Sequence, residues 1–557
     1  MVDTPIHPLL RDRVVDLPTA ARRRFDEATV AMARKQLDAA RVALEEVLAL
    51  APECVEAQRL LGLVAHMRGN YAEAVVVLGQ ALLAEPDNAL LHMNLGTSLY
   101  NSGEFSKAFA ALRRATELAA DFAPAWFSLG RAFHRRGRSA GAITALHRAL
   151  DLAPGDAVMR SQLAEAQASL GISAAACANY REVLRHEPGH PEAWLGLSRW
   201  QVEPFTAAEV SQLRQLMQRA DTTSESKWQL GFALARGLED QGDYHAAFRA
   251  LRKANGQRRK PLSWNAAQAS AGIAQLRAAF AEPPGDAGEP ARGSHVVFIA
   301  GLPRSGAGLL RRVLAGHAHI DAADRSPHLR DVLEEESRRR QQALPQWAAQ
   351  ATPVLWASLG QEYLARIGRA HDGDRYFVHQ GEQDWQLMVA AMAMLPGARL
   401  LDCRRDVLEN CLSCYRQLFT DNHQFSYDLD ELTSYWRDYD GLSRHWRQLY
   451  PGRIFQHSHE ALLADPAKQL HEVMAFLQLE DDPSCLEADS NGRSAGAGHA
   501  ARLREPPQPR PPRVPRYGNE LDRLGICWAW GELSAAGEST TQRACRGQPP
   551  LPGRLVQ

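Results

Sequence analysis

The fold is decided by a stretch that reads His295-Val-Val-Phe-Ile-Ala-Gly-Leu-Pro-Arg-Ser-Gly-Ala-Gly-Leu-Leu-Arg-Arg-Val-Leu314. Residues 295–300 form a short apolar run with β-branched side chains, which predicts a buried parallel strand. A turn rich in glycine follows, and apolar residues then recur at helical spacing up to Leu314. This order directs backbone N–H groups and a helix N-terminus at one point, which suits a phosphate or sulfate. Arg304 and Ser305 add a cation and a hydroxyl, so the stretch predicts an anion-binding cradle.

Two other interpretations of the stretch compete with this one. An ordinary strand-to-helix turn also needs glycine, for its backbone geometry alone. An ATPase P-loop needs a lysine directly after its second glycine, and Ala307 stands at that position. Because no lysine of this loop can reach a γ-phosphate, the sequence disfavours ATP hydrolysis.

Length and composition limit the classes of function. A chain of 557 residues holds about two to four domains. The 64 Lys and Arg balance 65 Asp and Glu, so nothing predicts binding to nucleic acid or to a membrane surface. The eight cysteines lack the spacing of a metal site and suit a reducing compartment. No apolar signal core or run of about 20 apolar residues occurs, and we expect a cytoplasmic protein without a bound metal.

A repeat of 34 residues fills the chain from residue 21 to about residue 200. Its register is carried by Pro52, Pro86, Pro154 and Pro188; by Leu61, Leu95, Leu129, Leu163 and Leu197; by Gly69, Gly103, Gly137 and Gly171; and by Ala40, Ala74, Ala108, Ala142 and Ala176. Period and residue types follow the tetratricopeptide pattern, in which each repeat is a pair of helices. The repeats predict an α-solenoid that binds a protein or peptide partner, or a second copy of the chain.

Composition divides the rest of the chain. Residues 1–20 are an N-terminal segment, residues 201–282 read as a divergent repeat and cap helices, and residues 283–292 form a linker rich in Pro and Gly. Between 293 and 488, apolar runs at 376–379, 398–403 and 453–456 alternate with helical patterns, which predicts an α/β domain with a mostly parallel sheet. Residues 489–557, rich in Pro, Arg, Gly and Ser, favour a low-complexity tail without stable structure.

A second set of anion-binding groups follows the run 398–403. Arg404 and Arg405 stand at the end of this predicted strand, and Ser413 lies about two helical turns further on. Arginine binds phosphate bidentately, and ligands of open α/β sheets gather at the carboxyl ends of strands, so this site and the glycine loop should share one crevice. The competing interpretation is a surface salt-bridge cluster around Asp406.

With these motifs the chain resembles the bacterial tetratricopeptide-repeat sulfotransferases, which are related to tyrosylprotein sulfotransferases. The resemblance covers roughly residues 21–485 and is carried by the repeats together with Phe298-Ile-Ala-Gly-Leu-Pro-Arg-Ser-Gly306, Cys403-Arg-Arg-Asp406, Cys411-Leu-Ser-Cys-Tyr415, Phe425-Ser-Tyr-Asp-Leu-Asp430 and Glu460-Ala-Leu-Leu-Ala-Asp-Pro466. It implies a P-loop-like loop that binds the phosphosulfate of 3′-phosphoadenosine 5′-phosphosulfate, the sulfuryl donor, and an acceptor that bears a hydroxyl group.

The resemblance also implies roles for single residues. The 5′-phosphosulfate would be held by the loop residues Arg304, Ser305, Gly306, Ala307, Gly308 and Leu309. Arg405 and Ser413 would hold the 3′-phosphate, Arg304 would stabilise charge during transfer, and Asp324 falls near the position of the family's general base.

The chain departs from the family pattern at three places. Ala307 and Gly308 replace two threonines, His379-Gln-Gly-Glu-Gln-Asp384 replaces an Asp-Lys-x-Pro-x-Asn segment, and no nucleotide-contacting loop is recognised after Asp489. Two functions therefore stay open: a sulfotransferase, and an impaired sulfotransferase-like domain within a tetratricopeptide interaction scaffold.

Overall fold

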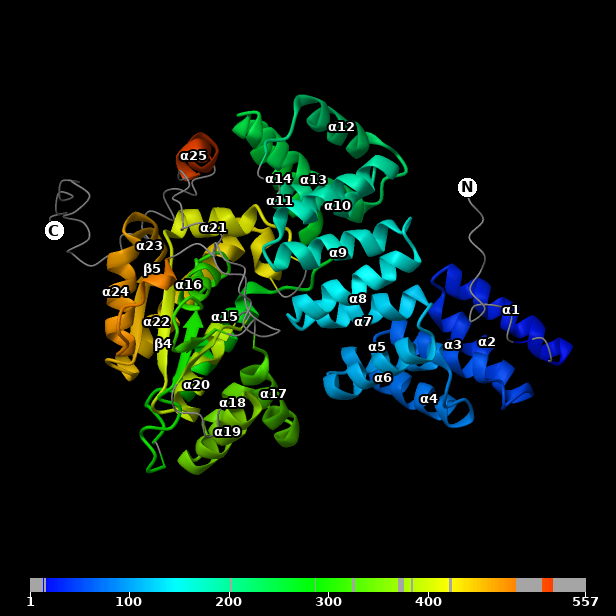
Figure 1. Ribbon diagram of the computed structural model, residues 1–557, viewed down its shortest axis with the longest axis horizontal. Coiled ribbons are helices and arrows are strands. Elements are labelled where there is room, and N and C mark those ends of the chain that lie inside the picture. The colour runs from blue at the N-terminus through cyan, green and yellow to red at the C-terminus, as the bar shows by residue number, and fades with distance from the viewer. Residues whose placement is uncertain are drawn as a thin grey trace, which may run out of the picture. The chain divides into compact units, whose positions relative to one another are not determined.

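The computed structural model describes residues 14, 17–200, 203–285, 287–322, 326–368, 375–381, 384–419, 423–486 and 513–523. The chain divides into two compact units, residues 1–188 and 189–557, which are treated separately below (Figure 1). The division comes earlier than the predicted end of the repeats at residue 200, because the next helix, α11 (Pro191–Trp200), belongs to the second unit.

The first unit is a row of paired helices. They are α1 (Thr19–Ala33), α2 (Leu37–Leu50), α3 (Val55–Met67), α4 (Tyr71–Ala84), α5 (Ala89–Asn101), α6 (Phe105–Leu118), α7 (Ala123–Arg135), α8 (Ser139–Leu152), α9 (Ala157–Ser169) and α10 (Ser173–His186). Figure 1 shows them stacked pair on pair, from blue to cyan. The predicted α-solenoid of helix pairs is confirmed.

The repeated residues explain this stack. The turn glycines Gly69, Gly103, Gly137 and Gly171 all have a positive φ, between 73° and 88°, which glycine adopts without steric cost. Within the pairs, a Cβ atom at Gly96 would lie 2.7 Å from Cγ of Leu112, so only glycine lets α5 and α6 approach this closely. The repeated alanines, such as Ala74 and Ala108, are fully buried in the same core.

The second unit begins with helices and continues as an α/β domain. Its helices are α11, α12 (Ala207–Gln218), α13 (Ser224–Asp240), α14 (Tyr244–Arg259), α15 (Ala266–Ala279), α16 (Ala307–Leu314), α17 (His328–Arg340), α18 (Leu344–Ala348), α19 (Pro353–Arg366), α20 (Met388–Met394), α21 (Val407–Tyr415), α22 (Leu429–Leu449), α23 (His459–Ala464), α24 (Pro466–Leu477) and α25 (Val514–Arg523), with 3-10 turns η2 (Asp384–Leu387), η3 (Gln424–Tyr427) and η4 (Pro483–Cys485).

The described strands of this unit form one parallel sheet in the order β2-β3-β1-β4-β5. They are β1 (Val296–Ala300), β2 (Ile320–Asp321), β3 (Tyr376–His379), β4 (Arg399–Arg404) and β5 (Ile454–Ser458). β1 lies in the centre, buried along its whole length, as the apolar run predicted. The predicted α/β domain with a parallel sheet is confirmed.

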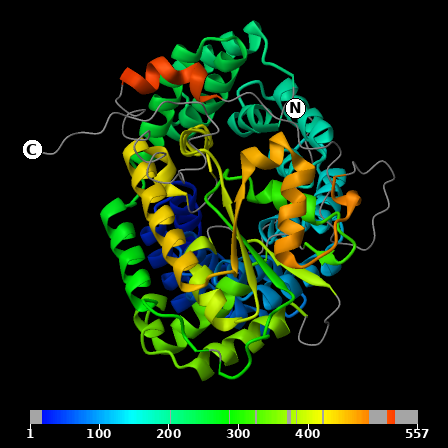
Figure 2. The same ribbon diagram turned by 90° about the vertical axis from the view of Figure 1, so that its left-hand side faces the viewer.

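Helices cover both faces of this sheet (Figure 2). On one face Val297 and Ile299 of β1 pack with apolar residues of α16 and α24. On the other face the ring of Phe298 contacts Tyr363 of α19, with the ring centroids 6.0 Å apart. The alternation of neighbouring β1 residues between the two faces follows from the period of two in a strand.

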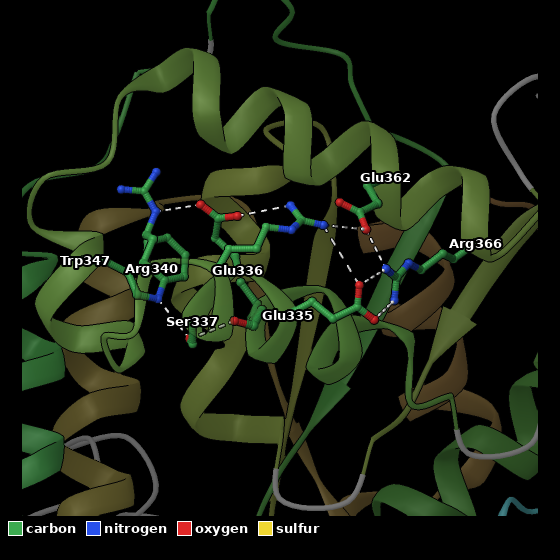
Figure 3. A network of polar contacts seen from close by, with 9 residues as sticks. Glu335, Glu336, Ser337, Arg340, Trp347, Glu362 and Arg366 are labelled. Atoms are coloured by element: carbon green, nitrogen blue, oxygen red, sulfur yellow. Dashed lines mark hydrogen bonds and ion pairs between the residues drawn. The ribbon is translucent and has the colours of Figure 1, made fainter. Parts of the chain in front are cut away.

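An ion-pair network joins α17 to α19 on the second of these faces (Figure 3). Arg366 of α19 contacts Glu335 of α17 at 2.6 Å and Glu362 at 2.5 Å. The largely buried Glu336 accepts from Arg340 at 2.6 Å. Because several charges share partners, this network fixes the position of α17 better than isolated surface pairs would.

Several elements differ from the sequence prediction. β2 was not predicted, since a strand of two residues leaves no periodic pattern. The helical pattern after the run 453–456 is divided into two helices, because Pro466 starts α24 and Asp465 caps it by accepting from N–H of Lys468 at 3.1 Å. Within the tail predicted to lack structure, residues 514–523 form α25. Residues 489–512 and 524–557 of that tail, and Asp324, lie outside the described residues.

Candidate functional site

The candidate site lies at the carboxyl ends of β1, β4 and β5. β1 is paired with β3 on one side and with β4 on the other, so the chain connections turn in opposite directions from this centre. Such a switch point is where open α/β sheets bind their ligands. The loop after β1, Gly301 to Gly306, contacts one side of α21 and the residue that follows β5, His459.

The backbone of the glycine loop is unusual at two positions. Arg304 has φ of +68° and Gly306 has φ of +99°. A left-handed arginine is uncommon and costs on the order of 1 kcal/mol, so the surroundings must hold it in place. Glycine is required at 306 for a second reason as well, since a Cβ atom there would lie 2.5 Å from Nδ1 of His459. At Gly301 a Cβ atom would lie 2.5 Å from Oγ of Ser305.

Helix α21 holds this loop. The carbonyl oxygen of Pro303 accepts from Nδ2 of Asn410 at 3.0 Å and from Sγ of Cys414 at 3.1 Å. Arg304 donates from Nε to Oγ of Ser413 at 3.0 Å, and Arg405 donates to the carbonyl oxygen of Arg304 at 3.3 Å. The structure thus brings together Arg304, Arg405 and Ser413, which the sequence predicted would share one crevice.

Three buried polar atoms around the loop have no hydrogen-bond partner among the described residues. They are Oγ of Ser305, Nε of Arg405 and Nδ1 of His459. Leaving such a buried group unpaired costs about 1–3 kcal/mol, so a ligand that pairs with it would be bound more strongly. A phosphate or sulfate offers the oxygens that these three groups lack.

The head of α16 adds backbone donors. The carbonyl oxygen of Gly306 accepts from N–H of Leu309 at 2.9 Å and of Leu310 at 3.0 Å. The N–H groups of Ala307 and Gly308 lie in the first turn of α16, where backbone N–H groups have no acceptor within the helix. Ala307 and Gly308 lack the hydroxyls found in the family, but they keep the backbone groups that bind an anion. A Cβ atom at Gly308 would meet open space.

The electrostatics of the site favour a negative ligand. The pKa of His459 is lowered to about 4, first by burial and then by the charges of Arg405 and Arg304. His459 is therefore neutral at pH 7, while both guanidiniums remain charged. Glu409 is the nearby acid, with its carboxylate 3.6 Å from Arg405.

Of the two adjacent arginines, only Arg405 faces the loop. Arg404 forms ion pairs with Asp402 at 3.0 Å and Asp440 at 2.8 Å. Burial raises the pKa of Asp402, but Arg404, Ser443 and Tyr439 outweigh burial and lower it below its ordinary range. Arg404 thus belongs to a buried structural cluster with Asp402 and Asp440, which differs from the surface cluster around Asp406 that was the competing interpretation, whereas Arg405 lies at the site.

The cysteines at the site are structural. Cys411 and Cys414 lie buried in α21 and are not disulfide-bonded. Burial raises the pKa of both thiols, that of Cys414 to about 12, so neither is an activated nucleophile.

The C-terminal helix α25 docks beside α21. Oε1 of Glu409 accepts from the N–H groups of Arg513 at 2.6 Å and Val514 at 2.7 Å. Tyr517 is buried, its hydroxyl donates to Glu239 of α13, and Glu239 also pairs with Arg416 at the end of α21. Sequence analysis missed this contact and also missed His459. The position of His459 directly after a parallel strand was the signal that could have identified it.

A buried polar chain replaces the family segment near residue 379. The hydroxyl of Tyr363 and Nδ1 of His379 are 3.0 Å apart, and Nε2 of His379 lies 3.1 Å from Asp384. Arg330 donates to the same carboxylate at 2.8 Å. Tyr363, His379 and Asp384 are almost wholly inaccessible to solvent, so this chain is a buried support at the carboxyl end of β3.

The described residues contain no group of three or more His, Cys, Asp or Glu side chains that could hold a metal ion. Among the helices of the described ranges, none has the length and apolar character needed to cross a membrane.

Two parts of the chain match models of known protein families. Residues 296–483 match the model of the sulfotransferase family. Residues 25–89, 69–124 and 93–157 match a tetratricopeptide-repeat model. The chain therefore combines tetratricopeptide repeats with a sulfotransferase-family domain, as its motifs predicted.

Individual relatives are distant. An uncharacterized protein of Aquifex aeolicus (strain VF5) is 23% identical over 295 residues, which cover 51% of this chain and 38% of that protein. The chain thus matches only about two fifths of the length of this curated relative. Two solved structures are also similar: MamA from Desulfovibrio magneticus RS-1 (20% identity, 31% of this chain and 98% of that chain, TM-score 0.28) and a thermophilic tetratricopeptide-repeat protein of Thermus thermophilus (22% identity, 33% and 100%, TM-score 0.30).

Proposed function

We propose that this sulfotransferase-family domain transfers a sulfuryl group from 3′-phosphoadenosine 5′-phosphosulfate to a hydroxyl group of an acceptor. The observation that carries the proposal is a set of three buried atoms without a hydrogen-bond partner among the described residues, Oγ of Ser305, Nε of Arg405 and Nδ1 of His459, gathered around the glycine loop. Their surroundings are cationic, and the domain that contains them matches the sulfotransferase family.

The donor molecule carries anionic groups at two ends, and the site has two groups of donors to match. Loop residues 304–309 would bind the 5′-phosphosulfate through backbone N–H groups and Ser305. Arg405 and Ser413 would bind the 3′-phosphate, with the planar guanidinium of Arg405 donating bidentately. Because Arg304 already bonds to Ser413 at 3.0 Å, the two groups are close enough to act on one nucleotide.

The proposed reaction is an in-line transfer. When bound, the donor supplies a sulfuryl group on a phosphate leaving group. The bond from sulfur to the phosphate oxygen breaks while a bond to the acceptor oxygen forms, and the acceptor proton passes to a base. Arg304 would stabilise the charge that gathers on the leaving phosphate, as cations do in phosphoryl transfer. We assign the base to Asp324, which lies outside the described residues.

A second function is favoured by one specific observation. The hydroxyls that the family places at 307 and 308 are absent, and the space next to Gly308 is open. Losing transition-state hydrogen bonds of this kind lowers rates by roughly a hundredfold or more. The alternative is therefore a domain that binds the nucleotide but turns over poorly, within a scaffold that binds partner proteins through its repeats.

The experiment that tests the site is calorimetric titration with 3′-phosphoadenosine 5′-phosphate, the donor without its sulfuryl group. We expect binding by the wild type and a loss of at least about tenfold in Arg405→Ala, since hydrogen bonds to charged groups contribute about 1.5–3 kcal/mol. Arg437→Ala is the matched control, because Arg437 is an exposed arginine of α22 and not one of the residues proposed to bind the nucleotide. A well-folded wild type that does not bind would contradict both functions.

An assay of sulfuryl transfer distinguishes the active sulfotransferase from the domain that only binds the nucleotide. With radiolabelled donor and a panel of peptide, glycan and small-molecule acceptors, a sulfotransferase yields a labelled acceptor, and Arg304→Ala abolishes the label. Nucleotide binding that depends on Arg405 but is never accompanied by transfer would favour the scaffold.

A further inference from the structure

Four aromatic rings of the first unit contact one another in a row that joins α5, α6 and α7. The ring centroids of Phe105 and Tyr100 are 5.2 Å apart, those of Tyr100 and Phe109 are 6.4 Å apart, and those of Phe109 and Phe133 are 5.0 Å apart. Tyr100 is buried and the three phenylalanines are half-buried. The packing between the helices therefore fixes the position of each ring.

Each of these rings carries an arginine. The pairs, with the distance from the guanidinium carbon to the ring centroid, are Arg136 and Phe105 (3.9 Å), Arg135 and Tyr100 (4.7 Å), Arg138 and Phe109 (5.3 Å), and Arg113 and Phe133 (6.0 Å). We call these eight residues the arginine–aromatic row. A guanidinium held against a ring keeps its charge, and the N–H groups along its edge can bind an anion bidentately.

The row lies in a strongly basic part of the chain. Residues 105–150 contain eight Lys and Arg and two Asp and Glu, a net charge of +6, whereas the whole chain carries −1. Within the described ranges, no acid forms an ion pair with Arg113, Arg135 or Arg138. Arg135 is held further by donating to Oδ1 of Asn101 at 3.0 Å, an uncharged acceptor that leaves its charge in place.

Two acids of neighbouring repeats have partners of their own. Glu104 stands 34 residues before Arg138, and its carboxylate contacts Lys107 at 2.6 Å. Glu165 of α9 accepts from the hydroxyl of Tyr180 at 2.7 Å. Neither acid forms an ion pair with the row in the described part of the chain, so the row keeps an excess of positive charge.

The surface around the row lacks large exposed apolar side chains. Among the described residues from 84 to 157, every large apolar side chain is buried or half-buried. On either side of this range the character changes, since Leu83 is 86% exposed and Val158 is 56% exposed. A partner that binds at the row therefore contacts it through charge and hydrogen bonds.

We propose that the arginine–aromatic row binds an acidic polysaccharide whose sugar units carry carboxylates. The carboxylates would pair with the guanidinium edges of Arg113, Arg135 and Arg138, and the sugar hydroxyls would bond to the polar surface beside them. Charge complementarity favours this occupant, and a sugar polymer brings no large apolar side chains that would need partners here. The proposal concerns the first unit alone and does not depend on sulfuryl transfer.

Two other polyanions fit this surface less well. Single-stranded nucleic acid gains much of its affinity by stacking bases on open rings, and the rings of the row are covered by arginines. An acidic peptide that binds tightly also buries apolar anchors, and residues 84–157 offer no large exposed apolar side chain to receive them.

Fluorescence anisotropy of the full-length protein tests the proposal. The probe is a fluorescein-labelled oligogalacturonate, in which each sugar carries a carboxylate, and its partner probe is the methyl ester, in which the charge is removed. We expect binding of the acid, weakened by salt, and little binding of the ester. The double variant Arg135→Gln with Arg138→Gln should bind the acid roughly tenfold more weakly, as the loss of two exposed ion pairs implies.

The matched control is the double variant Arg114→Gln with Arg148→Gln. It removes the same charge from exposed arginines of α6 and α8 that are not part of the row, and it should bind within about twofold of the wild type. Circular dichroism checks that both double variants keep their helices. Unchanged titration with 3′-phosphoadenosine 5′-phosphate in both would separate this surface from the nucleotide site.

Four results would overturn the proposal. The first is a wild type that does not bind the oligogalacturonate, and the second is equal binding of its methyl ester. The third is a control variant that binds as weakly as Arg135→Gln with Arg138→Gln, since net charge alone would then explain the binding. The fourth is displacement of the probe by an oligouridylate or an oligoglutamate at lower concentration than by unlabelled oligogalacturonate.

Discussion

The imidazole of His459 lies against the glycine loop with Nδ1 unbonded, and its neighbours Arg304 and Arg405 help to keep it neutral. A phosphate bound among these groups should raise the pKa of His459 again, because its negative charge favours the protonated ring. Binding of the nucleotide should therefore take up a proton whenever the pH lies between the lowered pKa and its raised value in the complex.

The first prediction follows from this proton uptake. The free pKa of His459 is about 4, lowered from 6.5, so a ligand that raises it is bound more tightly as the pH falls. We expect the affinity ratio of wild type to His459→Gln for 3′-phosphoadenosine 5′-phosphate to grow between about pH 7 and about pH 5. Calorimetry at several pH values measures it, and taking the ratio cancels the titration of the ligand itself. A constant ratio would show that His459 does not sense the anion.

Gly308 offers a gain-of-function test at the same scale. Because a Cβ atom there meets open space, Gly308→Thr should fit without displacing a neighbour and would restore a hydroxyl at the head of α16. We expect nucleotide affinity to rise about tenfold, as for one hydrogen bond to a charged group. Gly306→Ala is the opposite control, since its Cβ would collide with His459 and its φ of +99° disfavours alanine. Unchanged affinity in Gly308→Thr would mean that position 308 does not face the ligand.

At the scale of elements, close contact between paired helices decides the stability of the first unit. A Cβ atom at Gly96 would meet Leu112, whereas one at Gly79 of α4 would meet nothing within 4 Å. Gly96→Ala should lower the free energy of unfolding by about 1–3 kcal/mol through overpacking. Gly79→Ala should raise it by about 0.5–1 kcal/mol, because alanine is the better helix former. Thermal unfolding of both variants measures the difference, and equal midpoints would refute the packing argument.

Glu409 contacts both the start of α25 and the guanidinium of Arg405. Replacing Glu409 by Gln removes the negative charge 3.6 Å from Arg405 but keeps an acceptor for the N–H groups of residues 513 and 514. Nucleotide affinity should rise about fivefold, the effect of roughly 1 kcal/mol from a partly screened charge. Tryptic cleavage after Arg516 should stay as slow as in the wild type.

Tyr517→Ala is the comparison for that experiment. It removes the buried ring and the bond to Glu239, so cleavage after Arg516 should become at least about tenfold faster. If cleavage is equally fast in the wild type, α25 is not docked in solution. If Glu409→Gln lowers the affinity, the carboxylate is part of the binding site and not a competitor for Arg405.

The elements also show what the sequence could predict. Repeats in register and buried strands are recognisable by their periodicity, and the strand-end rule correctly brought Arg405 to the glycine loop. The apolar run that predicted β5 ends at residue 456, whereas the strand continues to Ser458, so the sequence did not place His459 at a strand end. Unpaired atoms such as Oγ of Ser305 cannot be predicted from sequence, since they depend on every neighbour in space. α25 was missed because its docking rests on a distant residue, Glu239, while its local composition favours disorder.

At the scale of the whole molecule, every described residue of the candidate site belongs to the unit 189–557. We therefore expect a fragment of residues 189–557 to bind 3′-phosphoadenosine 5′-phosphate within about twofold of the full chain, a difference below about 0.5 kcal/mol. Calorimetry on the purified fragment tests this. Lost binding by a folded fragment would mean that the repeats contribute to the nucleotide site.

The left-handed backbone of Arg304 has a consequence for how this domain changes over generations. Glycine would adopt a φ of +68° with no steric penalty, so in a domain relieved of its ligand, drift should replace the arginine at little risk to folding. If the loop binds the proposed nucleotide, we therefore expect relatives of this architecture that bind it to keep arginine at this position and relatives that have lost the ligand to vary there.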